Sequence, residues 1–223
     1  MIETEPYKVL GIDPALTAMG VAGTTGPDLD PVLICVKPKL QGHERLALLL
    51  SEVRRLAAGA DLVVIENLPG YVAHVGTTIK QAELLGLIKH KLWELGIPYA
   101  LVAPAQVKQF ATGSGSADKH DVVRAVYRRW PRAERWGRVG PDEADALWLA
   151  AMGAQWLREP IVALPLAQAD VVHAVWDGKT RGHKRGDPKI VWPSFTPRRD
   201  VVEADIVGDD GTPLTAAEAA ELF

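Results

Sequence analysis

The chain has 223 residues, a formal net charge of −3 at pH 7 and 48% hydrophobic residues, which is enough to bury a core as one domain or as one domain with an appendage. It contains no apolar run long enough to span a bilayer and no signal-peptide pattern, so we expect a cytoplasmic protein with no membrane partner. The one cysteine, Cys35, excludes an internal disulfide and a cysteine-based zinc site.

The hydrophobic pattern predicts three strands with short connections, followed by alternating helices and strands. The strands are expected at residues 8–13, 18–24, 31–37, 61–66 and 98–103. The helices are expected at 43–58, 76–95, 104–110, 116–129 with Ser116 as the cap, and from Pro141 onward. This order predicts an α/β fold with a mixed five-stranded sheet, three antiparallel strands first and parallel additions after them, and helices on both faces.

Four acidic residues stand at positions where such a fold brings side chains together. Asp13 and Glu66 each end a buried strand, and they lie side by side if those strands are parallel neighbours. Asp142 and Asp145 are three residues apart and share one face of the last helix. Taken singly, Asp13 and Glu66 are better explained as turn-forming acids, and the other two are explained equally well as partners of the helix dipole. Together, four carboxylates without a basic neighbour in sequence need a cation, and an oxygen-only ligand set favours magnesium or manganese.

Five motifs occur in an order and spacing that resemble the RuvC family of Holliday-junction resolvases, over about residues 8–157. They are Gly11–Gly20, Val63–Glu66, Pro104–Lys108, Gly113–Lys119 and Asp142–Leu147. The resemblance implies the RNase H-like fold, a homodimer, and magnesium-dependent cutting of four-way DNA junctions. It also implies that Asp13, Glu66, Asp142 and Asp145 are catalytic and bind the metal. Lys119 matches a lysine near the active site, and Lys108 a DNA-contacting position.

The sequence departs from the family pattern in two places. Ala15-Leu16-Thr17 replaces the usual Gly-Ser-Arg after Asp13-Pro14, a version associated with phage-type relatives. The loop at 67–74 has no phenylalanine, where bacterial members use an aromatic wedge at the junction centre. Tyr71 is the candidate to replace it, so the mode of junction opening and the cleavage preference stay open.

Phosphodiester hydrolysis needs an activated water and a stabilised leaving oxygen, and two metal ions about 4 Å apart can provide both. We therefore expect two Mg²⁺ ions per site, with Mn²⁺ as a substitute. Asp13 would bridge the ions, Glu66 and Asp142 would complete one shell, and Asp145 the other. Lys119 would offset charge on the attacked phosphate, unless it is only a solvated lysine of the first helical turn.

The stretch from Lys108 to Arg138 carries eight basic residues against three acids, in a chain whose total charge is negative. Phosphate contacts dominate DNA affinity, so Arg124 and Arg128 in this stretch are candidate DNA-binding residues. Ser114 and Ser116 lie in a Gly-Ser loop that brings backbone donors close to a phosphate, and a plain flexible loop explains that pattern nearly as well.

We predict a nuclease domain at residues 1–159 and a C-terminal extension at 160–223. The extension is basic at 177–199, and a second DNA-contacting arm, a dimer-wrapping tail and a solvated loop all explain this pattern. Three other functions remain: a broader branched-DNA or flap nuclease, a sugar-kinase or actin-like ATP-binding protein, and a non-catalytic junction-binding scaffold. Cleavage of four-way, three-way and flap substrates tests the first, nucleotide binding by calorimetry the second, and magnesium-dependent nicking the third.

Overall fold

The computed structural model describes residues 6–24, 26, 30–68, 75–176 and 190–191. The strands are β1 (Val9–Asp13), β2 (Met19–Thr24), β3 (Val32–Val36), β4 (Leu62–Glu66), β5 (Tyr99–Val102) and β6 (Ile190–Val191). The helices are α1 (Gly42–Ala57), α2 (Val75–Glu94), α3 (Pro104–Thr112), α4 (Lys119–Arg129), α5 (Pro141–Trp156), α6 (Leu166–Ala169) and α7 (Val171–Trp176), with the 3-10 helix η1 (Pro131–Trp136) between α4 and α5.

The strands form one sheet in the order β3-β2-β1-β4-β5-β6. β1 and β3 pair antiparallel with β2, whereas β4 pairs parallel with both β1 and β5. The predicted mixed sheet of five strands is therefore confirmed. The sixth strand, β6, pairs antiparallel with the edge strand β5, and it was not predicted because two residues are too short to show a strand periodicity.

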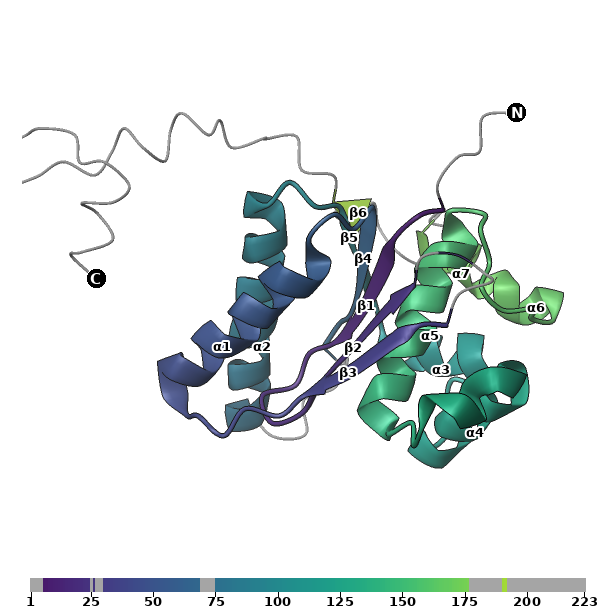
Figure 1. The fold of residues 1–223 in the computed structure, drawn as a ribbon, viewed down its shortest axis with the longest axis horizontal. Coiled ribbons are helices and arrows are strands. Elements are labelled where there is room, and N and C mark those ends of the chain that lie inside the picture. The colour runs from purple at the N-terminus through teal and green to yellow at the C-terminus, as the bar shows by residue number, and fades with distance from the viewer. Residues whose placement is uncertain (1–5, 25, 27–29, 69–74, 177–189, 192–223) are drawn as a thin grey trace, which may run out of the picture.

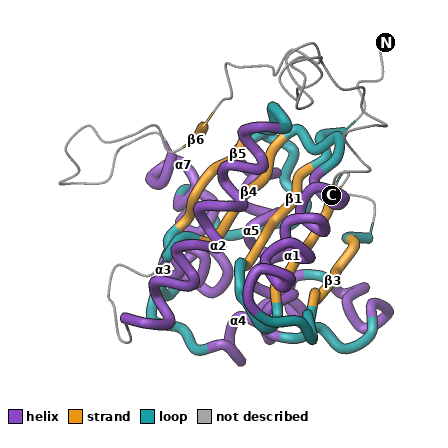
Figure 2. Tube along the Cα trace, turned by 90° about the vertical axis from the view of Figure 1, so that its left-hand side faces the viewer, coloured by secondary structure: helices purple, strands orange, loops and turns teal. Residues whose placement is uncertain are grey.

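Helices cover both faces of the sheet, giving three layers (Figure 1). α1 and α2 pack on one face, where they enclose a core with Leu49 and Ile88 fully buried. Figure 2 looks onto this face, with the strands crossing behind the two helices. α3, α4 and α5 lie on the other face, around Phe110 and Trp148. The prediction of helices on both faces is confirmed.

Helix α5 lies unusually close to the sheet, and three glycines make that approach possible. A Cβ atom at Gly11 in β1 would lie 2.0 Å from the carbonyl oxygen of Ala146, and one at Gly20 in β2 would lie 2.0 Å from that of Asp142. On the helix, a Cβ at Gly153 would lie 2.7 Å from Cγ1 of Val9. These contacts place the first turn of α5 over the carboxyl end of β1, so the helix runs antiparallel to that strand.

Two details of the helices differ from the sequence prediction. The cap of α4 is Asp118, whose Oδ1 accepts a hydrogen bond from the Asp121 backbone N–H at 2.8 Å, so the assignment to Ser116 was wrong. Both residues are good capping types, and only the backbone conformation distinguishes them. The short helices α6 and α7 were not predicted, because an apolar stretch this brief has no clear period. They pack on α3, and α7 also contacts α5.

The predicted division at residue 159 stays a prediction. Val171, Val172 and Val175 of α7 are buried in the same core as α5, while 177–189 and 192–223 lie outside the described residues. The predicted basic segment therefore falls almost wholly outside them. Within the described ranges, no helix has both the length and the hydrophobicity needed to cross a membrane.

Candidate active site

Asp13 and Glu66 meet at the carboxyl ends of the two central parallel strands. Ile12 of β1 is in register with Ile65 of β4, so the two acids that follow are the next pair along the ladder. They are close enough that, besides burial, the charge of Asp13 raises the pKa of Glu66. Asp13 retains only 9% of its accessible surface. The sequence prediction that these two side chains lie side by side is thus what the structure shows.

Asp142 and Asp145 approach the same point from helix α5. Gly140 is the N-cap of the helix and Pro141 occupies the first turn, where a missing N–H costs nothing. The backbone of Asp142 lies directly over Gly20, which is the register partner of Asp13 across β1 and β2. Two strand ends and one helix start therefore bring all four acids to the same edge of the sheet, beside the positive end of the α5 dipole.

The pKa values of three of the four acids are raised, so the cluster does not keep every carboxyl group ionised at neutral pH without a cation. Burial, together with the charge of Asp145, raises the pKa of Asp13 to about 7, against the opposing charge of Lys119. Burial also raises the pKa of Glu66 to about 9, with Asp13 and Asp145 adding to the effect. For Asp145, burial raises the pKa to about 6 against the pull of Lys119. Near neutral pH the cluster thus retains protons that a bound cation would displace.

The donor set fits a hard divalent cation, although the side chains are not already arranged around one. Within the part of the chain described, no three His, Cys, Asp or Glu side chains stand as a ready set of metal ligands. A cation bound here would favour the ionised carboxylates over the protonated carboxyl groups. The oxygen-only chemistry of the cluster and the raised pKa values of three of its members agree with such an exchange.

Two lysines lie beside the acids. Lys119 is the first residue of α4, and its Nζ lies 4.0 Å from Oδ1 of Asp142 while its side chain stays 64% exposed. Lys108 on α3 is half-buried and lowers the pKa of Asp145 through its charge. Both residues therefore contribute positive charge near the cluster.

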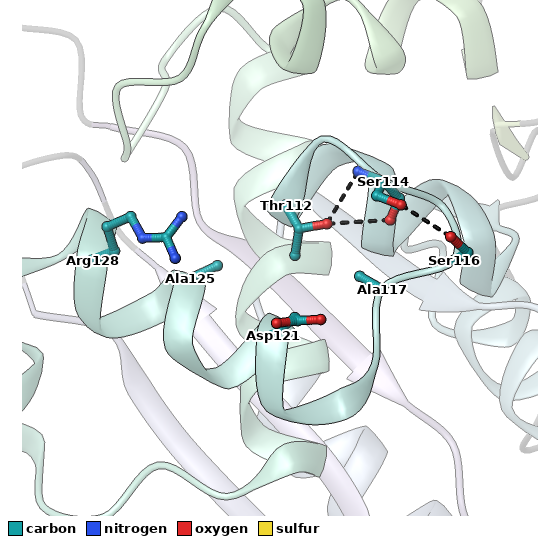
Figure 3. Close-up of a pocket in the computed structure, with 7 residues that line it drawn as sticks. All are labelled: Thr112, Ser114, Ser116, Ala117, Asp121, Ala125 and Arg128. Carbon is teal, nitrogen blue, oxygen red and sulfur yellow. Dashed lines mark hydrogen bonds between the residues drawn. The ribbon is translucent and has the colours of Figure 1, made fainter.

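The other predicted DNA contacts gather around the loop between α3 and α4. Ser114, Ser116 and Arg128 line a pocket on this loop and on α4 (Figure 3). Arg124 also lies on α4, but its guanidinium pairs with the carboxylate of Asp121. Of the two predicted arginines, Arg124 therefore already has an acidic partner, whereas Arg128 lines the pocket. Tyr71 lies outside the described residues.

Sequence reasoning missed residues that hold this loop in place. Gln168 of α6 is buried, and its Oε1 accepts a hydrogen bond from Nη2 of Arg129 at 3.3 Å. Its amide also lies 3.5 Å from where a Cβ atom at Gly113 would stand. Gly113 has a φ of 89°, in the region that favours glycine. No sequence pattern signals Gln168, since a lone amide in an apolar stretch has no period.

Comparisons with known proteins agree on one family. The family model for crossover junction endodeoxyribonuclease RuvC matches residues 9–151. The protein of that name from Gloeobacter violaceus is 31% identical over 180 residues, which cover 75% of this chain and 95% of that protein. The one from Rhodococcus opacus is 33% identical over 156 residues, covering 64% and 78%. Among solved structures, T. thermophilus RuvC in complex with Holliday junction substrate aligns with a TM-score of 0.56 and 24% identity, over 70% of this chain and 98% of that one, which shows a shared RNase H-like fold.

Proposed function

Because the chain belongs to the RuvC family of crossover junction endodeoxyribonucleases, we propose that it is a structure-selective DNA endonuclease that resolves four-way junctions by paired nicks. One observation carries this proposal beyond the family assignment. The ends of β1 and β4 and the start of α5 deliver four carboxylates to one edge of the sheet, with lysines beside them. Branched DNA is then the substrate, and hydrolysis of a phosphodiester bond is the reaction.

We propose that the acidic cluster holds two Mg²⁺ ions, and that Mn²⁺ can take their place. The ligands are Asp13, Glu66, Asp142 and Asp145. Bound there, the ions would lower the pKa of the attacking water and stabilise the leaving oxygen. The work of the chain itself is to hold the four carboxylates on rigid elements and to exclude bulk water from Asp13, which burial and the sheet register already do.

Lys119 and Lys108 act at the rim of the cluster in this proposal. A phosphodiester bound beside the four acids adds a negative charge to a site that already contains several acidic groups. The Lys119 ammonium group, 4.0 Å from Asp142, is exposed enough to reach a phosphate oxygen while it stays near the acids. Lys108, whose charge acts on Asp145, would contact the DNA backbone.

The DNA runs from the cluster over the loop before α4 and along α4. Ser114, Ser116, Arg124 and Arg128 lie along this path, and all four are exposed in the described part of the chain. Tyr71 is proposed to stand in for the aromatic wedge at the junction centre. DNA affinity on such a surface comes from backbone phosphates and therefore falls with added salt.

We propose that the enzyme acts as a homodimer, because two identical sites match the two-fold symmetry of a four-way junction. An exposed face of α2 supports this. Val75 and Ile79 are 67% and 62% exposed, and Ala82, Gly86 and Trp93 continue the same face at the spacing of a paired helix. An apolar stripe of this kind on a described surface is typical of a contact with another protein chain.

The deciding experiment is a cleavage assay on a synthetic four-way junction. The expected result is a pair of symmetric nicks in the presence of Mg²⁺ and intact DNA in EDTA. Three-way and flap substrates of the same arm sequence serve as controls for structure selectivity. Equal cutting of all three substrates would favour a broader branched-DNA nuclease, and junction binding without any cutting would favour a scaffold.

A further inference from the structure

Tyr127 on helix α4 carries a polar group next to the segment of chain that leads into α5. The two helices lie side by side on one face of the sheet (Figure 1). Their first turns meet at the acidic cluster, where Lys119 of α4 approaches Asp142 of α5. Tyr127 lies eight residues after Lys119, about two helical turns further along α4.

The Tyr127 hydroxyl group makes two hydrogen bonds to the residues just before α5. It accepts one from the Val139 backbone N–H at 3.0 Å and donates one to the carbonyl oxygen of Gly137 at 3.5 Å, which is long for such a bond. One phenol oxygen thus bridges both ends of the segment 137–139. Val139 retains only 5% of its accessible surface, so its N–H needs a partner within the protein.

The start of α5 depends on support from outside the helix. Its N-cap is Gly140, and no side chain in the described part of the chain caps it by a hydrogen bond. The contact between Gly20 and the Asp142 backbone limits how close the helix comes to the sheet, but a steric limit sets no lateral position. The bond from Tyr127 reaches the chain one residue before Gly140. It therefore restrains the turn that carries the acids.

A second hydrogen bond joins α4 and α5 and does not involve Tyr127. Trp148 Nε1 donates to the carbonyl oxygen of Val122 at 3.3 Å. Trp148 is fully buried, with the rings of Phe110 and Trp130 against it. Loss of the Tyr127 hydroxyl group therefore leaves the two helices packed and releases only the segment before α5.

We propose that Tyr127 is a positioning residue of the nuclease. Its hydroxyl group fixes the segment 137–139, and thereby the direction in which the first turn of α5 presents its two acids to Asp13. The inference rests on the proposed function, and adds to it a residue that acts through the acids and not on the DNA. A displacement of about 1 Å in a catalytic group costs roughly 10²-fold in rate, so a tether at this point matters.

Tyr127→Phe tests the proposal, because it removes one oxygen atom and keeps the ring that packs against the core. Single-turnover cleavage of a four-way junction at saturating DNA is expected to fall about tenfold, less than for a full displacement of about 1 Å, because other contacts of α5 remain. The Mg²⁺ concentration that gives half the maximal rate should rise, since the acids on α5 are then less well placed as ligands. Junction affinity in Ca²⁺ should stay within about twofold of wild type, because it comes mainly from phosphate contacts.

Metal binding without DNA gives a readout that does not depend on cleavage. Calorimetric titration with Mg²⁺ should show weaker binding by Tyr127→Phe than by wild type. Tyr99→Phe is the matched control, since it removes the same atom from a buried tyrosine at the start of β5, at the edge of the sheet opposite the acids. It should keep the wild-type rate, Mg²⁺ dependence and metal affinity. Urea denaturation of both variants measures any loss of stability separately.

The results distinguish a positioning role from a purely structural one. If Tyr127→Phe loses stability but keeps the wild-type cleavage rate, Mg²⁺ dependence and metal affinity, the positioning role is overturned. Equal changes in Tyr127→Phe and Tyr99→Phe overturn it too, since the loss of any buried hydroxyl group would then have the same effect. If wild-type protein does not cut a four-way junction, the proposed function fails; weaker Mg²⁺ binding by Tyr127→Phe alone then still supports the tether, and unchanged binding overturns it as well.

Discussion

A methyl group at Gly20 tests whether the close approach of α5 to the sheet is what assembles the acidic cluster. Gly20 lies in β2 opposite Asp13, with the first turn of α5 directly above it. A Cβ atom there would lie 2.0 Å from the carbonyl oxygen of Asp142 and 2.5 Å from its carbonyl carbon. Because the obstacle is backbone rather than the tip of a side chain, no rotamer change relieves the clash.

The size of the effect follows from these distances. Ordinary contact begins at 3.4 Å, so the start of α5 must move away from β2 by about 1.4 Å. A displacement of about 1 Å in a catalytic group costs roughly 10²-fold in rate. Overpacking of a well-packed core typically costs about 1–3 kcal/mol, and a clash with backbone belongs at the upper end. Gly20→Ala should therefore lose both cleavage and stability.

Gly23→Ala is the matched control. It makes the same substitution on the same strand, but the nearest atom to the new Cβ is Cδ1 of Leu10 at 3.5 Å, an ordinary contact. The assay is single-turnover cleavage of a four-way junction, together with urea denaturation and binding in Ca²⁺. We expect Gly20→Ala to cut about 100-fold more slowly, to lose about 3 kcal/mol of unfolding free energy and to bind the junction within a few-fold of wild type. Gly23→Ala should stay close to wild type in all three.

Wild-type cleavage by folded Gly20→Ala would refute the reasoning, since the acids on α5 would then tolerate a shift that the geometry forbids. Equal losses in the two variants would also refute it, because the strand alone and not the helix above it would then be responsible.

Three other measurements bear on the site and the assembly. Asp13→Asn and Glu66→Gln should each abolish cleavage and leave junction binding in Ca²⁺ near wild type; full-rate cleavage by either variant would remove that residue from the mechanism. The pKa values of Asp13 and Glu66, raised to about 7 and about 9, mean that the folded, metal-free protein keeps protons that the unfolded chain releases above about pH 4. Urea denaturation in EDTA should therefore show the unfolding free energy falling by an amount on the order of a few kcal/mol from pH 5 to pH 9, with Mg²⁺ offsetting the loss; a flat profile in EDTA would contradict the burial of the pair. Ile79→Glu should turn a dimer into a monomer in sedimentation equilibrium, whereas Thr77→Glu, which adds the same charge at an exposed position off the apolar stripe, should not; a dimer that survives both would exclude the α2 face.

Most helices and strands are signalled by short stretches of sequence and could therefore be predicted. The strand pattern, the glycines that end helices and the alternation after the third strand each need only a few consecutive residues to be seen. The pairing of Asp13 with Glu66 followed from one further rule, that parallel neighbours end at the same edge of a sheet. The structure differs from the sequence prediction where the local signal is weak, as in the short helices α6 and α7, or where two residues signal equally well, as Ser116 and Asp118 do for the cap of α4.

The height of α5 above the sheet could not be predicted, and yet the cluster depends on it. Asp142 and Asp145 share a helix face in any arrangement, but the axial position of α5 decides whether that face meets Asp13. Steric fit sets this position, with Gly11 and Gly20 on the strands leaving room for the helix backbone. The signal for such a fit is the absence of a side chain, which looks the same in sequence as a glycine in a turn. The acids can therefore be recognised from sequence as candidate ligands, whereas their convergence also depends on residues that contribute no ligand atom.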